Sequence, residues 1–271
     1  MNRCISVLLC GVLVCAAPSV VYSQQFQCAP VADIPESEVT LIGEIHGTNE
    51  IPVLAIEQAC VLAKSGRQVI FVLELPRKEQ AAVDRFLASE GKRADREQLI
   101  SSSFWQSEKL NDGRSSIAML DLFMRVHSLR AQGAKITLLL DDGFGDEDRD
   151  MAMAQTILSA KEQSPEAIII GLFGSFHSSE SPGRERYPHQ AIGYRLRALQ
   201  PLTVYVNYTG WAWGCTPSAC GVIRVGVVSP DAEFFKYIPG DEGEIDHAHD
   251  GVVNLPKITA SPPARYLVRT N

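Results

Sequence analysis

Acidic and histidine side chains follow four apolar segments of this chain, at the point where each segment ends. In an open parallel sheet, ligands bind beyond the carboxyl ends of the strands, where the loops leave the framework. We therefore predict that these side chains meet in one functional pocket. In chain order, they are Glu44, His46, Glu74, Asp141, Asp142 and His177.

Glu44 and His46 stand two residues apart on an extended segment, so both side chains project to the same face. The carboxylate can then orient and polarise the imidazole, which makes His46 a candidate general base. Glu74 is expected beside Glu44, and two buried carboxylates require a cation or a shared proton. The candidates for that cation are His46, Arg77, Arg149 and a metal ion.

The triplet Asp148-Arg149-Asp150 opens the helix predicted after the third apolar segment. An aspartate at this position can cap free backbone amides, which is the interpretation we favour for Asp148. Arg149 can turn back toward a carboxylate or a developing oxyanion.

Other candidate groups point less clearly to chemistry. His247 and His249 lie in a polar stretch and are interpreted as a solvated loop, although a metal site is the alternative. His127 falls inside an amphipathic helix and is interpreted as structural, while His189 stays open. The run at 171–175 lacks the lysine of a phosphate-binding loop, and Ser175 is not in a G-x-S-x-G sequence, which disfavours a nucleophile-elbow hydrolase.

The elements that must position these groups alternate along the chain. Runs rich in β-branched residues, typical of buried strands, occupy 39–43, 68–75, 135–140, 167–173, 202–208 and 222–228. Helical periodicity occupies 49–65, 77–90, 114–132, 147–162 and 187–199. This alternation predicts an α/β fold, a mostly parallel sheet with helices on both faces. After Gly210, we expect an antiparallel edge hairpin, followed from Ser229 by a Pro- and Gly-punctuated tail.

The segment from Gly91 to Arg114 interrupts this alternation, and its short helix with Phe104 and Trp105 is a candidate lid. We find no internal repeat, so residues 24–271 are predicted to form a single domain.

Composition narrows the functional classes. The 271 residues are 45% hydrophobic and 21% charged, with a net charge of −7, so the long-range field repels nucleic-acid phosphates. Residues 1–23 combine Arg3, a short apolar run and small residues, which predicts a secretory signal peptide cleaved after Ser23. This run is too short to span a bilayer, and no later segment is long and apolar enough to do so. We therefore expect an exported protein, periplasmic or secreted.

Four of the seven cysteines follow residue 23, and an even number in an oxidising compartment suggests disulfides. The short loop between Cys215 and Cys220 favours their pairing, which leaves Cys28 to pair with Cys60. A zinc site is a weaker alternative, because C-x4-C lacks the usual C-x2-C spacing.

Four motifs resemble the erythromycin-esterase and ChaN-like superfamily, which includes the Tiki and TraB proteins. They are G-E-I-H-G-T-N-E at 43–50, Glu74 after an apolar strand, R-D-M-A-M-A at 149–154 and G-S-F-H at 174–177. The resemblance covers about 39–200. Its Glu44-Ile45-His46 spacing is one residue shorter than the esterase signature and closer to the ChaN and Tiki pattern.

The resemblance implies three chemistries on one scaffold, so the fold does not settle the function. Esterase-like members imply metal-free water activation, with His46 as the base, Glu44 and Glu74 as orienting carboxylates, Arg149 as an electrostatic stabiliser and His177 as a second base or ligand. Tiki-like members imply a metal bound by His46, Glu44, Glu74 and His177.

ChaN-like members imply haem binding in iron uptake, for which Tyr187 and Tyr194 are available, although neither aligns with a family ligand. The leading hypothesis is an exported hydrolase-like protein that attacks an ester or amide of a small-molecule substrate and requires no cofactor. The alternatives are a haem or metal carrier without catalysis, and a binding protein whose pocket performs no chemistry.

Overall fold

The computed structural model describes residues 27–108, 111–183, 188–216, 218–226, 228–240 and 248–267. The predicted signal peptide at 1–23 lies outside these residues. Among the described helices, none has the length and apolar character that a bilayer crossing requires.

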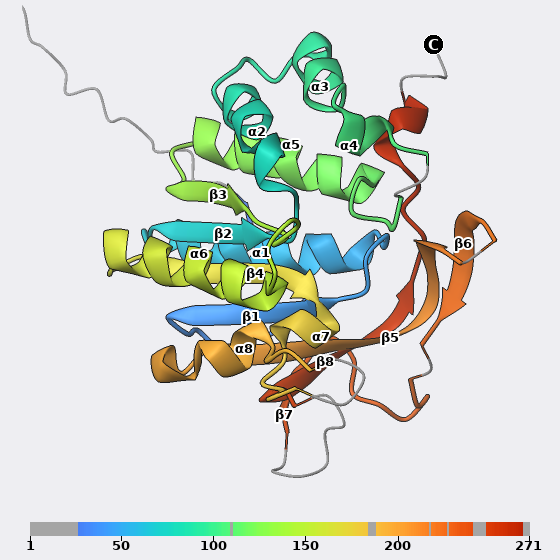
Figure 1. The fold of residues 1–271 in the computed structure, drawn as a ribbon. Helices are drawn as coiled ribbons and strands as arrows, with labels where there is room; N and C mark the ends of the chain where they lie inside the picture. The colour runs from blue at the N-terminus through green and yellow to red at the C-terminus, as the bar shows by residue number, and fades with distance from the viewer. Residues whose placement is uncertain are drawn as a thin grey trace, which may run out of the picture.

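The described strands form one eight-stranded, mostly parallel sheet in the order β3-β2-β4-β1-β5-β8-β7, with β6 paired to β5 (Figure 1). The strands are β1 (Val39–Glu44), β2 (Val69–Leu73), β3 (Ile136–Leu140), β4 (Ile168–Gly174), β5 (Leu202–Cys215), β6 (Cys220–Val225), β7 (Tyr237–Pro239) and β8 (Gly251–Ile258). Among these described strands, only β5 with β6 and β7 with β8 pair antiparallel. The predicted fold class is confirmed.

Helices cover both faces of the sheet, and each face has its own apolar core (Figure 1). On one face, α1 (Glu50–Lys64) and α5 (Ile117–Ala131) pack over Ile42 and Phe71. On the other, α6 (Arg149–Gln163) and α8 (Ile192–Arg195) pack over Leu41 and Val72. Successive strand residues thus face opposite cores, which explains the continuous apolar runs.

The remaining helices are short. They are η1 (Arg77–Glu79), α2 (Gln80–Leu87), α3 (Arg93–Leu99), α4 (Ser103–Gln106), α7 (Ser175–Ser178), η2 (Arg197–Leu199) and η3 (Ala264–Leu267). The predicted insertion holds α3 and α4. Its Trp105 is 1% exposed and contacts Phe123 of α5 edge to face, with ring centroids 6.0 Å apart. This tryptophan anchors the insertion to the core.

The segment after Ser229 corrects the expectation of an irregular tail. It returns to the sheet as β8, which lies between β5 and β7 and runs parallel to β5. Conversely, β6 extends the hairpin beyond the main sheet, and its residues alternate between partly buried and exposed instead of being fully buried.

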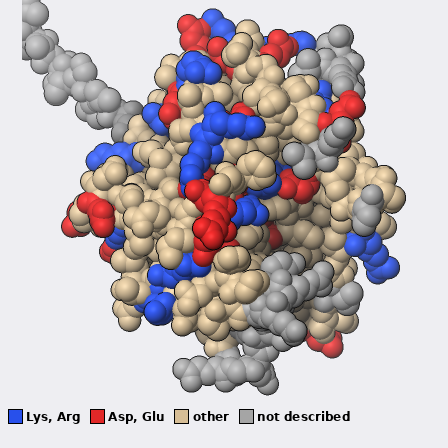
Figure 2. All heavy atoms as spheres, viewed as in Figure 1, with Lys and Arg blue, Asp and Glu red and all other residues tan. Residues whose placement is uncertain are grey.

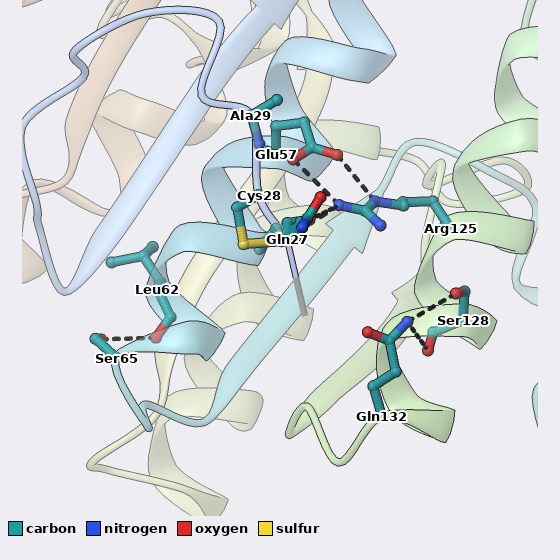
Figure 3. Close-up of a disulfide and its surroundings, with 10 residues drawn as sticks. Gln27, Cys28, Ala29, Glu57, Leu62, Ser65, Arg125, Ser128 and Gln132 are labelled. Atoms are coloured by element: carbon teal, nitrogen blue, oxygen red, sulfur yellow. Dashed lines mark hydrogen bonds and ion pairs between the residues drawn. A yellow bond between two sulfur atoms is a disulfide. The ribbon is translucent and has the colours of Figure 1, made fainter. Parts of the chain in front are cut away.

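Both predicted disulfides are present. Cys28 bonds to Cys60 and thereby ties the N-terminal arm to α1, whereas Cys215 and Cys220 close the β5–β6 hairpin. Beside the first disulfide, Glu57 of α1 accepts hydrogen bonds from the Ala29 backbone amide and from Arg125 of α5 (Figure 3).

Charged side chains are interspersed on the face shown in Figure 2, where acidic and basic groups lie next to each other. Although the net charge is −7, the acidic side chains on this face therefore do not form one large acidic patch.

Candidate active site

His46 lies just beyond the carboxyl end of β1 and is held between two buried glutamates. Its Nδ1 lies 2.8 Å from Oε1 of Glu44, the last residue of β1. Its Nε2 lies 3.6 Å from Oε2 of Glu74, which follows β2. The His46 side chain remains 19% exposed, so the imidazole still reaches solvent.

Glu74 is the centre of the cluster. Its Oε2 accepts a hydrogen bond of 2.8 Å from the Gly174 backbone amide. Its Oε1 accepts a hydrogen bond of 3.2 Å from Arg149 and lies 3.7 Å from Arg114. A buried carboxylate is costly unless it is paired, and these donors together with His46 provide the pairing.

His177 lies near the other carboxylate oxygen of Glu74. It belongs to α7, at the end of β4, and its Nδ1 lies 2.9 Å from Oδ1 of Asp150 in the first turn of α6. Its Nε2 lies 3.9 Å from Glu74 Oε1. Each imidazole therefore has Nδ1 against a carboxylate and Nε2 beside the same glutamate.

Gly174 leaves open a space that both imidazoles border. A Cβ atom built there would lie 3.4 Å from Glu74 Oε2, 3.5 Å from His177 Cδ2 and 3.7 Å from His46 Nε2. A small group in this space would contact all three side chains.

Electrostatics fix the charges of the central pair. Burial alone would lower the pKa of His46, but the carboxylates of Glu44 and Glu74 outweigh it and raise this pKa to about 10. Burial alone would raise the pKa of Glu74, but His46, His177 and Arg114 hold it well below its usual range. At neutral pH, His46 is a cation and Glu74 an anion.

The structure brings together all five residues predicted for the site, which are Glu44, His46, Glu74, Arg149 and His177. Arg77 is not among the cations at Glu74, because it binds Asp141 and Asp146 instead. Asp148 caps α6 as predicted, by accepting a hydrogen bond from the Met151 amide.

The sequence prediction did not include Arg114 and Asp112, which come from the end of the insertion. Arg114 contacts Glu74, Asp142 and Asp112, and Asp112 is near enough to His46 for the imidazolium to help lower its pKa. Neither residue follows a strand, so the strand-end rule could not find them.

His249 corrects the prediction of a solvated loop. Its side chain is buried, the residue being 7% exposed, and its Nε2 lies 3.0 Å from the Ser178 hydroxyl, close to Gly43 of β1. His127 contacts the Ser89 carbonyl from within α5 as a structural residue, whereas His189 lies 3.4 Å from Asp148. His247 lies outside the described residues.

The predicted metal ligands do not fit a metal centre. Among the described residues, the one group whose ligand atoms all lie close enough is Cys28, Glu57 and Cys60, and both of its cysteines are in a disulfide. At the predicted site, Glu74 already binds an amide and Arg149. A guanidinium in contact with this carboxylate also opposes a second cation.

A cleft of about 580 Å³ adjoins the cluster. It is lined by Pro76, Arg77, Lys78, Ser103, Phe104, Ser107, Asp112, Arg114, Asp142 and Phe144. None of these described lining residues is a histidine, tyrosine, cysteine or methionine, so the cleft offers no axial haem ligand. Tyr194 stacks with Arg197 elsewhere, and Tyr187 lies outside the described residues.

By sequence, no protein family and no curated protein matches the chain significantly. By structure, a Bacillus cereus protein superposes with a TM-score of 0.58 over 83% of this chain and 90% of its own, at 10% identity. An erythromycin esterase in its open conformation superposes with a TM-score of 0.58 over 83% of this chain and 92% of its own, at 11% identity. The predicted resemblance is confirmed at the level of the fold.

A haem-bound ChaN of Campylobacter jejuni is a weaker match, with a TM-score of 0.38 over 70% of this chain and 88% of its own, at 13% identity. That similarity is too low to support an argument about haem. At these identities, the comparisons establish a shared scaffold and leave the chemistry to the residues of the site.

Proposed function

We propose that the protein is a hydrolase that activates water against an ester carbonyl beside Glu74, without a resident metal or haem. The observation that carries the proposal is the paired arrangement of His46 and His177. Each imidazole is oriented through Nδ1 by a carboxylate, and the small space at Gly174 lies next to Nε2 of His46 and Cδ2 of His177. Orientation of an imidazole by a carboxylate is the arrangement that general acid–base catalysis requires.

The catalytic roles that we propose for the two imidazoles differ from the sequence-based prediction, in which His46 is the base. With its pKa raised to about 10, His46 is already protonated at neutral pH and cannot accept a proton. We assign the base to His177, oriented by Asp150. The His46 imidazolium and Arg149 then stabilise the negative charge that develops on the substrate oxygen.

The reaction follows from these assignments. His177 Nε2 takes a proton from water as the water oxygen forms a bond to the ester carbonyl carbon, and the carbonyl oxygen becomes an oxyanion beside His46. Collapse of this intermediate breaks the bond to the alcohol oxygen, which takes the proton back from His177. Glu74 keeps the cationic groups in place throughout.

We further propose that the protein acts outside the cytoplasm, as its predicted signal peptide implies. The two disulfides support this location, because such bonds persist in oxidising compartments. The periplasmic and secreted fractions of producing cells, separated by osmotic shock, would distinguish the two destinations.

Hydrolysis of p-nitrophenyl acetate by the purified protein tests the chemistry. We expect His177→Gln to lower kcat/KM by about 100-fold or more, since it removes the base. The matched control is His127→Gln, which changes a histidine outside the cluster and should leave the rate unchanged. Equal rates in the wild type and His177→Gln would contradict the proposal.

The pH profile separates the two assignments of the base. If His46 acts as a cation, activity should fall as the pH rises through about 10, where His46 loses its proton. If His46 is the base, activity should instead rise toward that pH. A rising profile would overturn our division of roles.

Gly174→Ala tests the position of the reacting groups. Its methyl group makes ordinary contacts of 3.4 Å or more and should leave the fold intact, but it occupies the space between the imidazoles. We expect kcat/KM to fall by about 100-fold with unchanged thermal stability. Gly221→Ala, where a Cβ meets nothing within 4 Å, is the control.

A further inference from the structure

The cleft beside the cluster has an apolar wall that the proposed chemistry does not use. Phe104 of α4, Pro76 after β2 and Phe144 after β3 supply this wall. Phe144 is 82% exposed, and the glycines on both sides of it, Gly143 and Gly145, have φ values of +60° and +96°. A phenyl ring at the rim of a cleft is exposed to water, so a ligand that covers the ring binds favourably by removing apolar surface from water.

Two residues that line the cleft also lie beside the reacting groups. Arg114 lines it and also lies 3.7 Å from Glu74 Oε1. Asp112 lines it as well, and it is close enough to His46 to feel its charge. A ligand seated against the phenylalanines would therefore have one end beside Arg114, which lies next to Glu74.

The charges of the cleft favour a ligand without a positive group. Its two acids, Asp112 and Asp142, are both paired with Arg114. Lys78 is exposed and has no ion pair among the described residues. Arg114 balances only one of these acids, but Arg77 and Lys78 also line the cleft, so its lining residues carry three positive and two negative charges, a net charge of +1.

We propose that this cleft binds the acyl group of esters of apolar carboxylic acids, with Phe144 closing over the chain and the carbonyl at Gly174. This inference rests on the proposed hydrolase function, which it narrows to uncharged or anionic esters with an apolar acyl part. Cationic substrates of the same size are disfavoured by Lys78.

Binding of sodium octanoate, measured by isothermal titration calorimetry, tests the cleft without requiring turnover. We expect Phe144→Ala to weaken octanoate binding about tenfold, because the chain loses the covering ring. Phe144→Leu should restore most of the affinity. Phe235 is exposed but does not line the cleft, so Phe235→Ala should bind octanoate like the wild type. Octylamine should bind at least tenfold more weakly than octanoate.

The outcomes separate the inference from the proposed function. Octanoate binding that depends on Phe144 supports the cleft even if no ester is hydrolysed, in which case the hydrolase proposal alone fails. If the folded wild type hydrolyses p-nitrophenyl acetate but does not bind octanoate, the inference that the cleft binds an apolar acyl group is contradicted, whereas the hydrolase proposal stands. Equal affinity in Phe144→Ala and the wild type, or tighter binding of octylamine, also contradicts the inference about the cleft.

Discussion

Glu74 determines how the neighbouring charges behave, because every cation of the cluster contacts its carboxylate. It lies 3.6 Å from His46 and 3.2 Å from Arg149. Without this carboxylate, the positive charges of these two side chains would lack their anionic partner. A cluster organised in this way keeps its histidine protonated at neutral pH. Its stability must then depend on pH in the alkaline range.

We predict that His46 contributes stability that is lost as the pH rises from about 6.5 to about 10. Its folded-state pKa lies above its ordinary value of 6.5, so the contribution is complete below that value and disappears as the pH passes about 10. Within this window the free energy of unfolding should decline as the pH rises. Urea unfolding of the wild type and of His46→Gln, at a series of pH values, measures it.

The difference between the two proteins isolates the contribution of His46, since lysines and tyrosines titrate in both. His127→Gln should keep the pH dependence of the wild type. If His46→Gln retained the full decline in unfolding free energy above pH 6.5, the charge assigned to this imidazole would be incorrect.

The sequence locates the residues of the cluster that follow strands, because the ends of parallel strands meet at one edge. The sequence does not locate the site residues that lie in loops, or those whose position depends on which face of a helix packs toward the site. Arg114 comes from an irregular insertion, and Asp150 shares its helical turn with the capping residue Asp148, so only the structure shows that it faces His177. The burial of His249 depends equally on contacts distant in sequence.

At the scale of elements, the two disulfides constrain loops of very different length. Cys28 and Cys60 are 32 positions apart and tie the N-terminal arm to α1, whereas Cys215 and Cys220 are 5 positions apart within one hairpin. A longer closed loop restricts the unfolded chain more strongly.

We therefore predict that the double variant Cys28→Ala/Cys60→Ala lowers the free energy of unfolding by roughly 3 to 4 kcal/mol. The matched variant Cys215→Ala/Cys220→Ala should lose only about 2 kcal/mol. Urea unfolding of both variants without reductant provides the measurement. A larger loss from the hairpin variant would show that chain entropy does not dominate.

The central elements could be predicted because each carries its own periodicity. Strands β1 to β5 are apolar runs, and the three longest helices between them, α1, α5 and α6, each span 15 residues. β8 was missed because Gly251–Ile258 contains Asn254 and Pro256 and follows a polar stretch. Its place beside β5 arises from long-range pairing, which local propensity does not encode.

At the scale of the whole molecule, the end of the described chain secures the loop that carries His46. The Ser261 amide donates a hydrogen bond of 2.8 Å to the Gly47 carbonyl, and Thr48 forms a β-bridge with Ala260. These contacts join segments more than 200 residues apart, as the 210 residues between Asn49 and Thr259 show. The site therefore depends on completion of the fold.

Thr259 offers a test of this long-range contact. Its amide and hydroxyl donate hydrogen bonds of 2.8 and 2.6 Å to the carboxylate of Glu50, at the start of α1, and its hydroxyl accepts one from Asn49. We expect Thr259→Val, which keeps the shape but removes the hydroxyl, to lower the free energy of unfolding by about 1 to 2 kcal/mol. It should also shift the NMR signals of the His46 ring, whereas Thr259→Ser should restore both. Unchanged stability and unchanged His46 signals in Thr259→Val would show that the loop is held in place without this contact.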